Sequence, residues 1–193
     1  MVKSNNSEGN FNYNNIEKKN KNFMYKNLQK SYCYNCDFSA SIFDFASFRG
    51  AHFKTCVFDR CSFKWAEFVG TNLKNCDFNN AVFDNTVFDS AKIEGVNFKE
   101  AKFNNTIFLS TDVEKAKNLN VKSPGIRIFN EMPQIEINDE LHGALVNAMK
   151  NKYVKASRVL DTKDGGLNLL NIIILLDNFD TAALRRGLNI IQA

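Results

Sequence analysis

Residues 76–108 read CDFNNAVFDNTVFDSAKIEGVNFKEAKFNNTIF, and a large apolar residue falls on every fifth position of this stretch. The same register extends in both directions, from Leu28 to Val113, and thirteen of the eighteen phenylalanines of the chain lie in it. A period of five matches neither the 3.6-residue period of an α-helix nor the two-residue period of a strand. The spacing therefore indicates a repeat architecture in which each unit packs against its neighbours.

Each repeat also carries a small residue two positions before its large one, as Cys36 precedes Phe38 and Ala81 precedes Phe83. The other three positions are mostly polar, which predicts that one large and one small side chain point inward and the rest face solvent. The predicted core consists of Phe38, Phe43, Phe48, Phe53, Phe58, Phe63, Phe68, Leu73, Phe78, Phe83, Phe88, Ile93, Phe98, Phe103 and Phe108.

This pattern resembles the pentapeptide-repeat family over residues 28–115. The resemblance implies an all-β solenoid, a right-handed quadrilateral β-helix in which one repeat forms each side and four repeats form a turn. Identities 20 residues apart, such as Cys36 with Cys56 and Gly50 with Gly70, agree with that turn length. Sixteen repeats then give about four coils, with a height of about 19 Å at one strand spacing per layer. A column of packed rings leaves no internal pocket, and the two open ends need caps.

The rest of the chain divides into a polar, basic N-terminal tail or cap (1–27), a connector (116–137) that contains both prolines, and a C-terminal helical segment (138–193). Asn138 is placed to cap a helix, because acidic residues and a helical apolar stripe follow it. The most apolar stretch, LNLLNIIILL at residues 167–176, predicts a buried helix and is too short for a membrane span. With no apolar core near the N-terminus for a signal peptide, we expect a cytoplasmic protein without membrane contact.

The cysteines are expected to fill the core rather than to bind metal. Cys33 and Cys36 match the C-x-x-C spacing of zinc and redox sites, but there is no second such pair, and His52 and His142 lie in other segments. Both cysteines also fall in the repeat register. The sequence shows no phosphate-binding loop, dinucleotide fingerprint or hydrolase motif. We therefore predict no catalytic residue, no cofactor, no metal and no enzyme activity.

Apolar residues at outward positions are the candidate contact surface, since contiguous exposed apolar patches mark interaction sites. Two sides of the predicted coil carry them: Ile42, Phe45, Trp65 and Val82 on one, and Val69, Val87, Ile107 and Leu109 on the next. Either a partner protein or the chain's own C-terminal helices could cover these residues. Both alternatives stay open at this point.

The C-terminal segment is also expected to form a homodimer. Its apolar surface exceeds what the end of one coil can cover, and Leu184, Leu188 and Ile191 form a separate stripe that continues almost to the last residue. Proteins of the resembled family pair through C-terminal helices about a two-fold axis, which agrees with the preference of oligomers for closed symmetry.

Two functions fit these features. The first is a non-catalytic scaffold that binds an unidentified protein. The second is implied by the resemblance, because some family members mimic duplex DNA, bind DNA gyrase or topoisomerase IV and protect cells from quinolones. A mimic of DNA needs dense negative charge, whereas residues 36–115 carry eleven acidic and nine basic residues. The scaffold is therefore favoured, a type II topoisomerase stays the alternative partner, and no direct binding of nucleic acid is expected.

Overall fold

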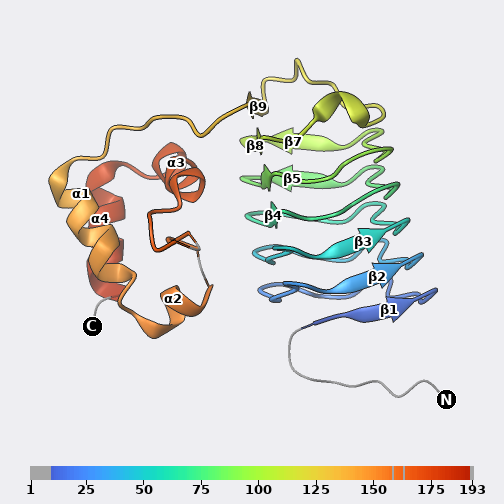
Figure 1. Cartoon of the computed structure of the whole chain (residues 1–193), viewed down its shortest axis with the longest axis horizontal. Coiled ribbons are helices and arrows are strands. Elements are labelled where there is room, and N and C mark those ends of the chain that lie inside the picture. The colour runs from blue at the N-terminus through green and yellow to red at the C-terminus, as the bar shows by residue number, and fades with distance from the viewer. Residues whose placement is uncertain (1–9, 158, 163, 192–193) are drawn as a thin grey trace. The chain divides into compact units, whose positions relative to one another are not determined.

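The computed structural model describes residues 10–157, 159–162 and 164–191, and the chain divides into two compact units at Glu131 and Met132. The first unit is a β-solenoid of about six turns, and the second is a group of helices (Figure 1).

The solenoid consists of parallel strands that pair with the strand one turn later. Asn12 pairs with Tyr32 and Tyr32 with His52, so one turn takes 20 residues, as the family resemblance implied. Between the strands, bridges at five-residue intervals join each turn to the next, such as Glu17 with Asp37. The strands are β1 (Asn12–Asn14), β2 (Tyr32–Tyr34), β3 (His52–Lys54), β4 (Glu67–Val69), β5 (Val82–Asp84), β6 (Val87–Asp89), β7 (Lys102–Asn104), β8 (Thr106–Leu109) and β9 (Ile126–Phe129).

The core is a set of phenylalanine stacks, one above another along the solenoid. Rings 20 residues apart lie parallel, with centroids 4.6 Å apart for Phe48 and Phe68 and again for Phe68 and Phe88. Fourteen of the fifteen predicted core residues are buried, while Phe103 is partly exposed. One turn later, Ser123 stands where the repeat would place its large inward residue, so no large ring lies in register above Phe103.

The five-residue period also has a backbone cause. Every fifth residue from Asn15 to Ser110 has a positive φ and turns the chain into the next side. This conformation suits Gly and Asn, which tolerate the left-handed region best. We call these residues the corner positions, the large inward residue the central position, and the residue two before it the small position.

The solenoid is longer than the sequence predicted at both ends. About four coils over residues 28–115 were expected, with a tail before them. Instead, residues 10–27 belong to a further turn that bonds to the next one, as Lys18 N does to Asp37 O at 2.7 Å. The repeat is obscured there because Lys18 holds a central position and Lys21 and Lys26 hold small positions. A terminal turn has only one neighbour, so its inward positions need not all be apolar.

The connector is likewise part of the solenoid up to β9, which pairs with β8 through Phe108 and Ile128. A short 3₁₀ helix, η1 (Val113–Lys115), and a loop precede β9. Gly125 lies in this loop where a Cβ atom would come within 2.0 Å of the carbonyl oxygen of Phe103. Only glycine permits this close approach of the last turn to the one before it.

The second unit contains α1 (Asp139–Ala148), α2 (Lys152–Ser157), α3 (Leu169–Asn178) and α4 (Thr181–Ile191). Asn138 caps α1 by accepting a bond from Leu141 N at 2.9 Å, as predicted. Asp180 accepts a bond from Ala183 N at 2.7 Å at the start of α4. The apolar faces meet in one core of Leu141, Ala144, Leu145, Ala148, Leu160, Ile172, Leu184 and Leu188.

Candidate interaction surfaces

A column of three aromatic residues runs along one corner of the solenoid. Tyr25, Phe45 and Trp65 occupy the same corner position in three successive turns. The rings of Tyr25 and Phe45 are stacked, with centroids 4.9 Å apart and planes inclined by 13°. Tyr25 is 71% exposed, Phe45 is 44% exposed and Trp65 is partly exposed. We call these three residues the aromatic column.

The backbone at these positions does not favour aromatic side chains. Tyr25, Phe45 and Trp65 have φ values of 59°, 60° and 55°, in the left-handed region. Bulky residues are uncommon there, and the conformation costs an L-residue about 1–2 kcal/mol. Asn or Gly occupies ten of the twenty corner positions between residues 15 and 110. The aromatic column is therefore the candidate contact surface of the solenoid.

The eight predicted surface residues fall into three groups in the structure. Ile42 and Phe45 are exposed, at 39% and 44%. Trp65, Val69 and Val82 are partly exposed. The prediction of an accessible surface is wrong for Val87, Ile107 and Leu109, which are buried.

Stacking within the solenoid accounts for part of that burial. Val87 pairs with Ile107, and Ile107 in turn with Arg127, so each has neighbours in the adjacent turns.

Tyr25 is an exposed residue of this surface that the sequence pattern did not identify. Its signal was its place 20 residues before Phe45, in a turn that was taken for a tail.

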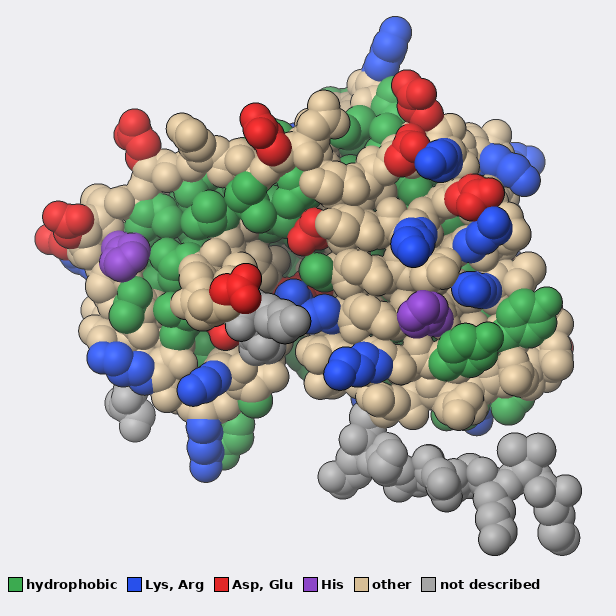
Figure 2. Space-filling view, in the orientation of Figure 1, with side chains coloured by type: hydrophobic (Ala, Val, Ile, Leu, Met, Phe, Trp, Pro, Cys, Tyr) green, Lys and Arg blue, Asp and Glu red, His purple; other side chains and the backbone are tan. Residues whose placement is uncertain are grey.

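Several charged side chains on the solenoid pair with a neighbour of opposite sign. Lys19 lies 3.0 Å from Asp37, and Arg49 lies 2.8 Å from Glu67. Burial alone would raise the pKa of Asp37, but hydrogen bonds from Ser39 and Lys19 outweigh it and leave that pKa below its ordinary value. On the solenoid face seen in Figure 2, basic and acidic side chains are interspersed. This is unlike the uniform charge of a nucleic acid.

Amide side chains extend this ladder of contacts. Asn97 donates to Asp77 at 2.9 Å and Asn104 donates to Asp84 at 2.7 Å, each across 20 residues. Some aspartate carboxylates therefore already accept hydrogen bonds from amide groups of the next turn, and fewer of them are left to bind a partner.

The five cysteines are free thiols buried in the solenoid. Four of them lie at small positions, where the side chain points back toward the preceding turn. The thiol of Cys76 donates to the carbonyl oxygen of Phe53, 2.8 Å away. Burial raises the pKa of Cys33 and Cys36, so neither has the character of a reactive thiolate. Within the described residues no group of three or more His, Cys, Asp or Glu side chains is arranged to hold a metal ion.

The helical unit uses two of the three predicted dimer contacts internally. Leu184 and Leu188 are buried, with 8% and 3% of their surface exposed, because they pack in the core with α1. Expecting them on a dimer surface was therefore wrong. Ile191 is 40% exposed, and its neighbour Ile190 is 76% exposed.

The helical unit also has a hollow of about 380 Å³ lined by Glu136, Ile137, Asn138, Leu141, Leu176 and Thr181. Its lining contains one carboxylate and no basic side chain, so no acid–base pair faces it. Across the described ranges, none of the helices has the length and apolar character needed to cross a lipid bilayer.

The repeat tract matches a known family model. The family model described as pentapeptide repeats matches residues 27–60, 36–75 and 66–105, with eight copies. No curated protein sequence matches significantly.

Several solved structures are similar to the chain. One is a pentapeptide repeat protein from the thylakoid lumen of Arabidopsis thaliana, at 18% identity and a TM-score of 0.35, with 85% of this chain and 90% of that chain covered. A trypsin-treated form of QnrB1, a plasmid-mediated fluoroquinolone resistance protein, has 13% identity and a TM-score of 0.26, with coverage of 62% and 92%. HetL of the cyanobacterium Nostoc, a pentapeptide repeat protein involved in the regulation of heterocyst differentiation, has 15% identity and a TM-score of 0.23, with coverage of 53% and 46%.

Proposed function

Because the repeat tract of this chain belongs to the pentapeptide-repeat family, we propose that the protein is a non-catalytic scaffold that binds a partner protein through the aromatic column. In this proposal the solenoid is the right-handed quadrilateral form of the β-helix, and the protein acts in the cytoplasm, where its five free thiols stay reduced.

The observation that carries the proposal is the placement of Tyr25, Phe45 and Trp65. Tyr25 and Phe45 are exposed and stack on each other, Trp65 is partly exposed at the same corner one turn later, and the backbone conformation at all three disfavours bulky side chains. Residues held in unfavourable conformations gather at functional sites, and aromatic residues dominate the binding energy of protein interfaces. Ile42, which is 39% exposed, lies three residues before Phe45 in the same repeat and adds apolar surface.

The rings of Tyr25 and Phe45 stack on each other, so one face of each ring is covered within the column. A sugar or a nucleotide base stacks on free ring faces, and this contact leaves fewer of them. Protein interfaces are enriched in exposed aromatic side chains, which bind without needing both ring faces. This is why the proposal names a protein rather than a carbohydrate or a single-stranded nucleic acid.

Site-specific photo-crosslinking in cells that express the chain tests the proposal. A photoreactive phenylalanine analogue replaces Phe45 in one variant and Arg60, at a corner position outside the aromatic column, in a matched control. We expect a protein that is captured from position 45 and not from position 60. Adding Trp65→Asn, which introduces the commonest corner residue, should abolish that capture. Identical products from both positions would contradict the proposal.

Protection of a type II topoisomerase is the second candidate, and membership of the repeat family is what favours it. The charge of the solenoid opposes it. About six turns at about 4.8 Å per turn span about 29 Å, over which duplex DNA carries about 17 negative charges. Residues 10–131, which make up these turns, carry seventeen basic and thirteen acidic residues. In a supercoiling assay with purified gyrase, with and without ciprofloxacin, we expect neither inhibition nor protection at equimolar protein, and salt-sensitive rescue from the drug would promote this candidate.

A further inference from the structure

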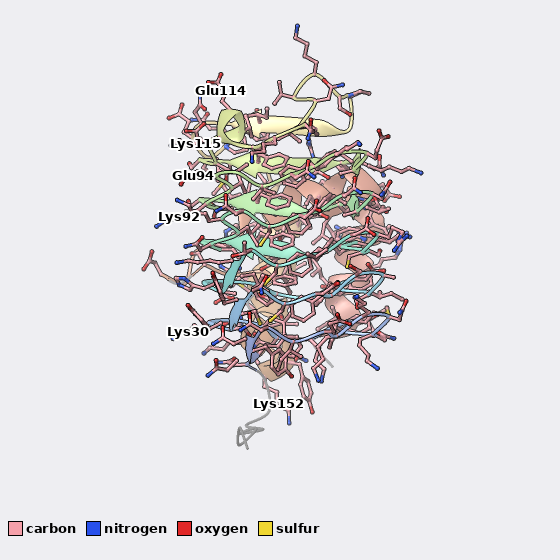
Figure 3. The ribbon with its side chains drawn as sticks, turned by 90° about the vertical axis from the view of Figure 1, so that its right-hand side faces the viewer. Lys30, Lys92, Glu94, Glu114, Lys115 and Lys152 are labelled. Carbon is pink, nitrogen blue, oxygen red and sulfur yellow. The ribbon has the colours of Figure 1, made fainter. Side chains whose placement is uncertain are left out.

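The net positive charge of the solenoid is concentrated in its first turn. Residues 10–30 contain five lysines (Lys18, Lys19, Lys21, Lys26 and Lys30) and one acidic residue, Glu17, whereas the twelve basic and twelve acidic residues of positions 31–131 cancel. Lys21, Lys26 and Lys30 are exposed and form no ion pair within the described part of the chain. Figure 3 shows Lys30 toward the first-turn end, whereas Glu94 and Lys115 lie in later turns. Glu94 pairs there with Lys74 at 3.0 Å, and Lys115 pairs with Asp112 at 3.0 Å.

Two of these lysines point off the N-terminal end of the solenoid. Lys21 and Lys26 occupy small positions, which later turns, at positions 31–116 of the same register, fill with Cys, Ser, Thr, Ala or Val. In those turns the small side chain reaches back to the preceding turn: Thr71 donates to Phe48 O at 2.9 Å, and Thr86 donates to Phe63 O at 2.6 Å. The first turn has no preceding turn among the described residues, so side chains at this position extend beyond its edge.

Backbone donors and apolar side chains accompany the lysines at this edge. In the second turn, Asp37 N donates to Ile16 O at 3.0 Å and Ser47 N donates to Lys26 O at 3.1 Å. The corresponding N–H groups of the first turn, at Glu17 and Asn27 for example, have no acceptor within residues 10–157, 159–162 and 164–191. Ile16, also at a small position, is 37% exposed. The end therefore offers ammonium groups, unpaired N–H donors and an apolar rim together.

A second copy of the chain does not suit this end. Two first turns that meet end to end would bring two sets of five lysines together, and like charges at close range repel. Lys21 and Lys26 would also lie between the stacked turns, and burial of unpaired ammonium groups is strongly unfavourable. Residues 1–9 carry one lysine and one glutamate, so their composition does not supply the missing negative charge either.

We propose that the N-terminal end of the solenoid, formed by residues 10–30, is a docking surface for an acidic segment of a partner protein. The inference rests on the proposed scaffold function and adds a second contact surface with a stated partner chemistry. Carboxylates and backbone carbonyls of such a segment accept hydrogen bonds from both the lysines and the unpaired N–H groups. Duplex DNA offers phosphates but nothing apolar to pack on Ile16 and Phe11. Ile16 is 37% exposed and Phe11 packs partly against the core, so this rim offers little free apolar surface for insertion into a lipid bilayer.

Binding of a fluorescent poly-glutamate peptide to the full-length chain tests the proposal. The variant Lys21→Ala/Lys26→Ala should bind the peptide about tenfold more weakly, since two charge pairs are lost. The control Lys92→Ala/Lys102→Ala removes the same charge from exposed positions of a later turn, so we expect a change of less than about twofold. Lys21→Gln/Lys26→Gln repeats the test with longer side chains, and circular dichroism verifies that each variant is folded.

Four results would overturn the inference. Equal losses in the variant and the control would mean non-specific attraction. Tighter binding to a duplex DNA oligonucleotide, or to vesicles containing phosphatidylserine, would name a different partner class. If Lys21→Ala/Lys26→Ala assembles end to end while its affinity for the peptide is unchanged, the lysines serve only to prevent association of two solenoid ends. None of these results affects the crosslinking at Phe45, because the substitutions leave Tyr25, Phe45 and Trp65 unchanged, so the two proposals fail separately.

Discussion

The thiol of Cys61 donates a hydrogen bond to the carbonyl oxygen of Phe38, 3.1 Å away and in the preceding turn of the solenoid. The same bond recurs at small positions across 23 residues, from Thr71 to Phe48, Thr106 to Phe83 and Thr111 to Phe88. A residue at a small position therefore does more than leave room for the neighbouring ring. When it is Ser, Thr or Cys, its side chain also forms a hydrogen bond with the preceding turn.

The buried thiol of Cys61 predicts that the protein loses stability at alkaline pH. Burial raises the pKa of Cys61 from 9.0 to about 12. Between these values the unfolded chain has lost a proton that the folded chain retains, so stability falls as pH rises above 9. The slope for this thiol is at most about 1.4 kcal/mol per pH unit.

Urea denaturation between pH 8 and pH 10.5 measures this effect, with Cys61→Ala as the control, because alanine fills other small positions and does not titrate. We expect the free energy of unfolding of the wild type to approach that of the variant, or to fall below it, as pH rises. Parallel curves for the two proteins would show that the thiol does not titrate differently on folding.

Phe78→Ala should reduce the free energy of unfolding more than Phe45→Ala does, because Phe78 lies in the core and Phe45 on the surface. Phe78 is fully buried and stacks between Phe58, at a centroid distance of 4.8 Å, and Phe98, at 5.6 Å. Its removal leaves a void in the column and should cost about 3–5 kcal/mol. Phe45 is 44% exposed, so its removal should cost about 1 kcal/mol or less, since surface substitutions act weakly. Chemical denaturation measures both, and equal losses would contradict the assignment of inward and outward positions.

The period of five was sufficient to predict the solenoid and its column of rings, because every internal turn must satisfy the same packing rule. The turn length of 20 residues was implied by the family resemblance. It could not locate the ends. Lys18 at a central position and Asn118 at its equivalent in the last turn break the pattern without breaking the structure, since a terminal turn packs on one side only.

The candidate surface was only partly predictable. Phe45 and Trp65 were found from their outward positions, but a positive φ that makes an aromatic residue unusual is a property of the backbone. For Leu184 and Leu188, the helical stripe predicted an apolar contact correctly. The periodicity did not specify whether that contact was another chain or α1 of the same unit.

Gly125→Ala should destabilise the last turn of the solenoid. The new methyl carbon would lie 2.0 Å from the carbonyl oxygen of Phe103 and 2.7 Å from its carbonyl carbon, and backbone atoms cannot move aside cheaply. We expect loss of hydrogen-exchange protection in β9 and a cost of about 1–3 kcal/mol. Gly143→Ala is the matched control in α1, where nothing lies within 4 Å of the new methyl group. It should stabilise the helical unit by up to about 1 kcal/mol. Unchanged protection of β9 in Gly125→Ala would refute the close approach.

The homodimer predicted for the C-terminal segment should form through the exposed end of α4 rather than through its buried stripe. Ile190 is 76% exposed, Ile191 is 40% exposed, and Tyr153 at the start of α2 is 71% exposed. These side chains belong to one end of the helical unit, because Asn151 donates to the carbonyl oxygen of Ile191 at 2.8 Å. Ile190→Ser/Ile191→Ser should leave the core of Leu184 and Leu188 intact and convert a dimer into a monomer in light scattering at micromolar concentration.

Phe179→Ser is the control for that experiment. Phe179 is 48% exposed but precedes α4, at the opposite end of the helix, so the dimer should persist in this variant. Deletion from Asp177 onward is a poorer test, because it removes Leu184 and Leu188 and with them part of the core that holds α1. We expect that deletion to unfold the helical unit while the solenoid keeps its β-structure in circular dichroism, since the two units have separate cores. A wild-type chain that scatters light as a monomer would exclude the dimer, and a dimer that survives Ile190→Ser/Ile191→Ser would place its contact elsewhere on the molecule.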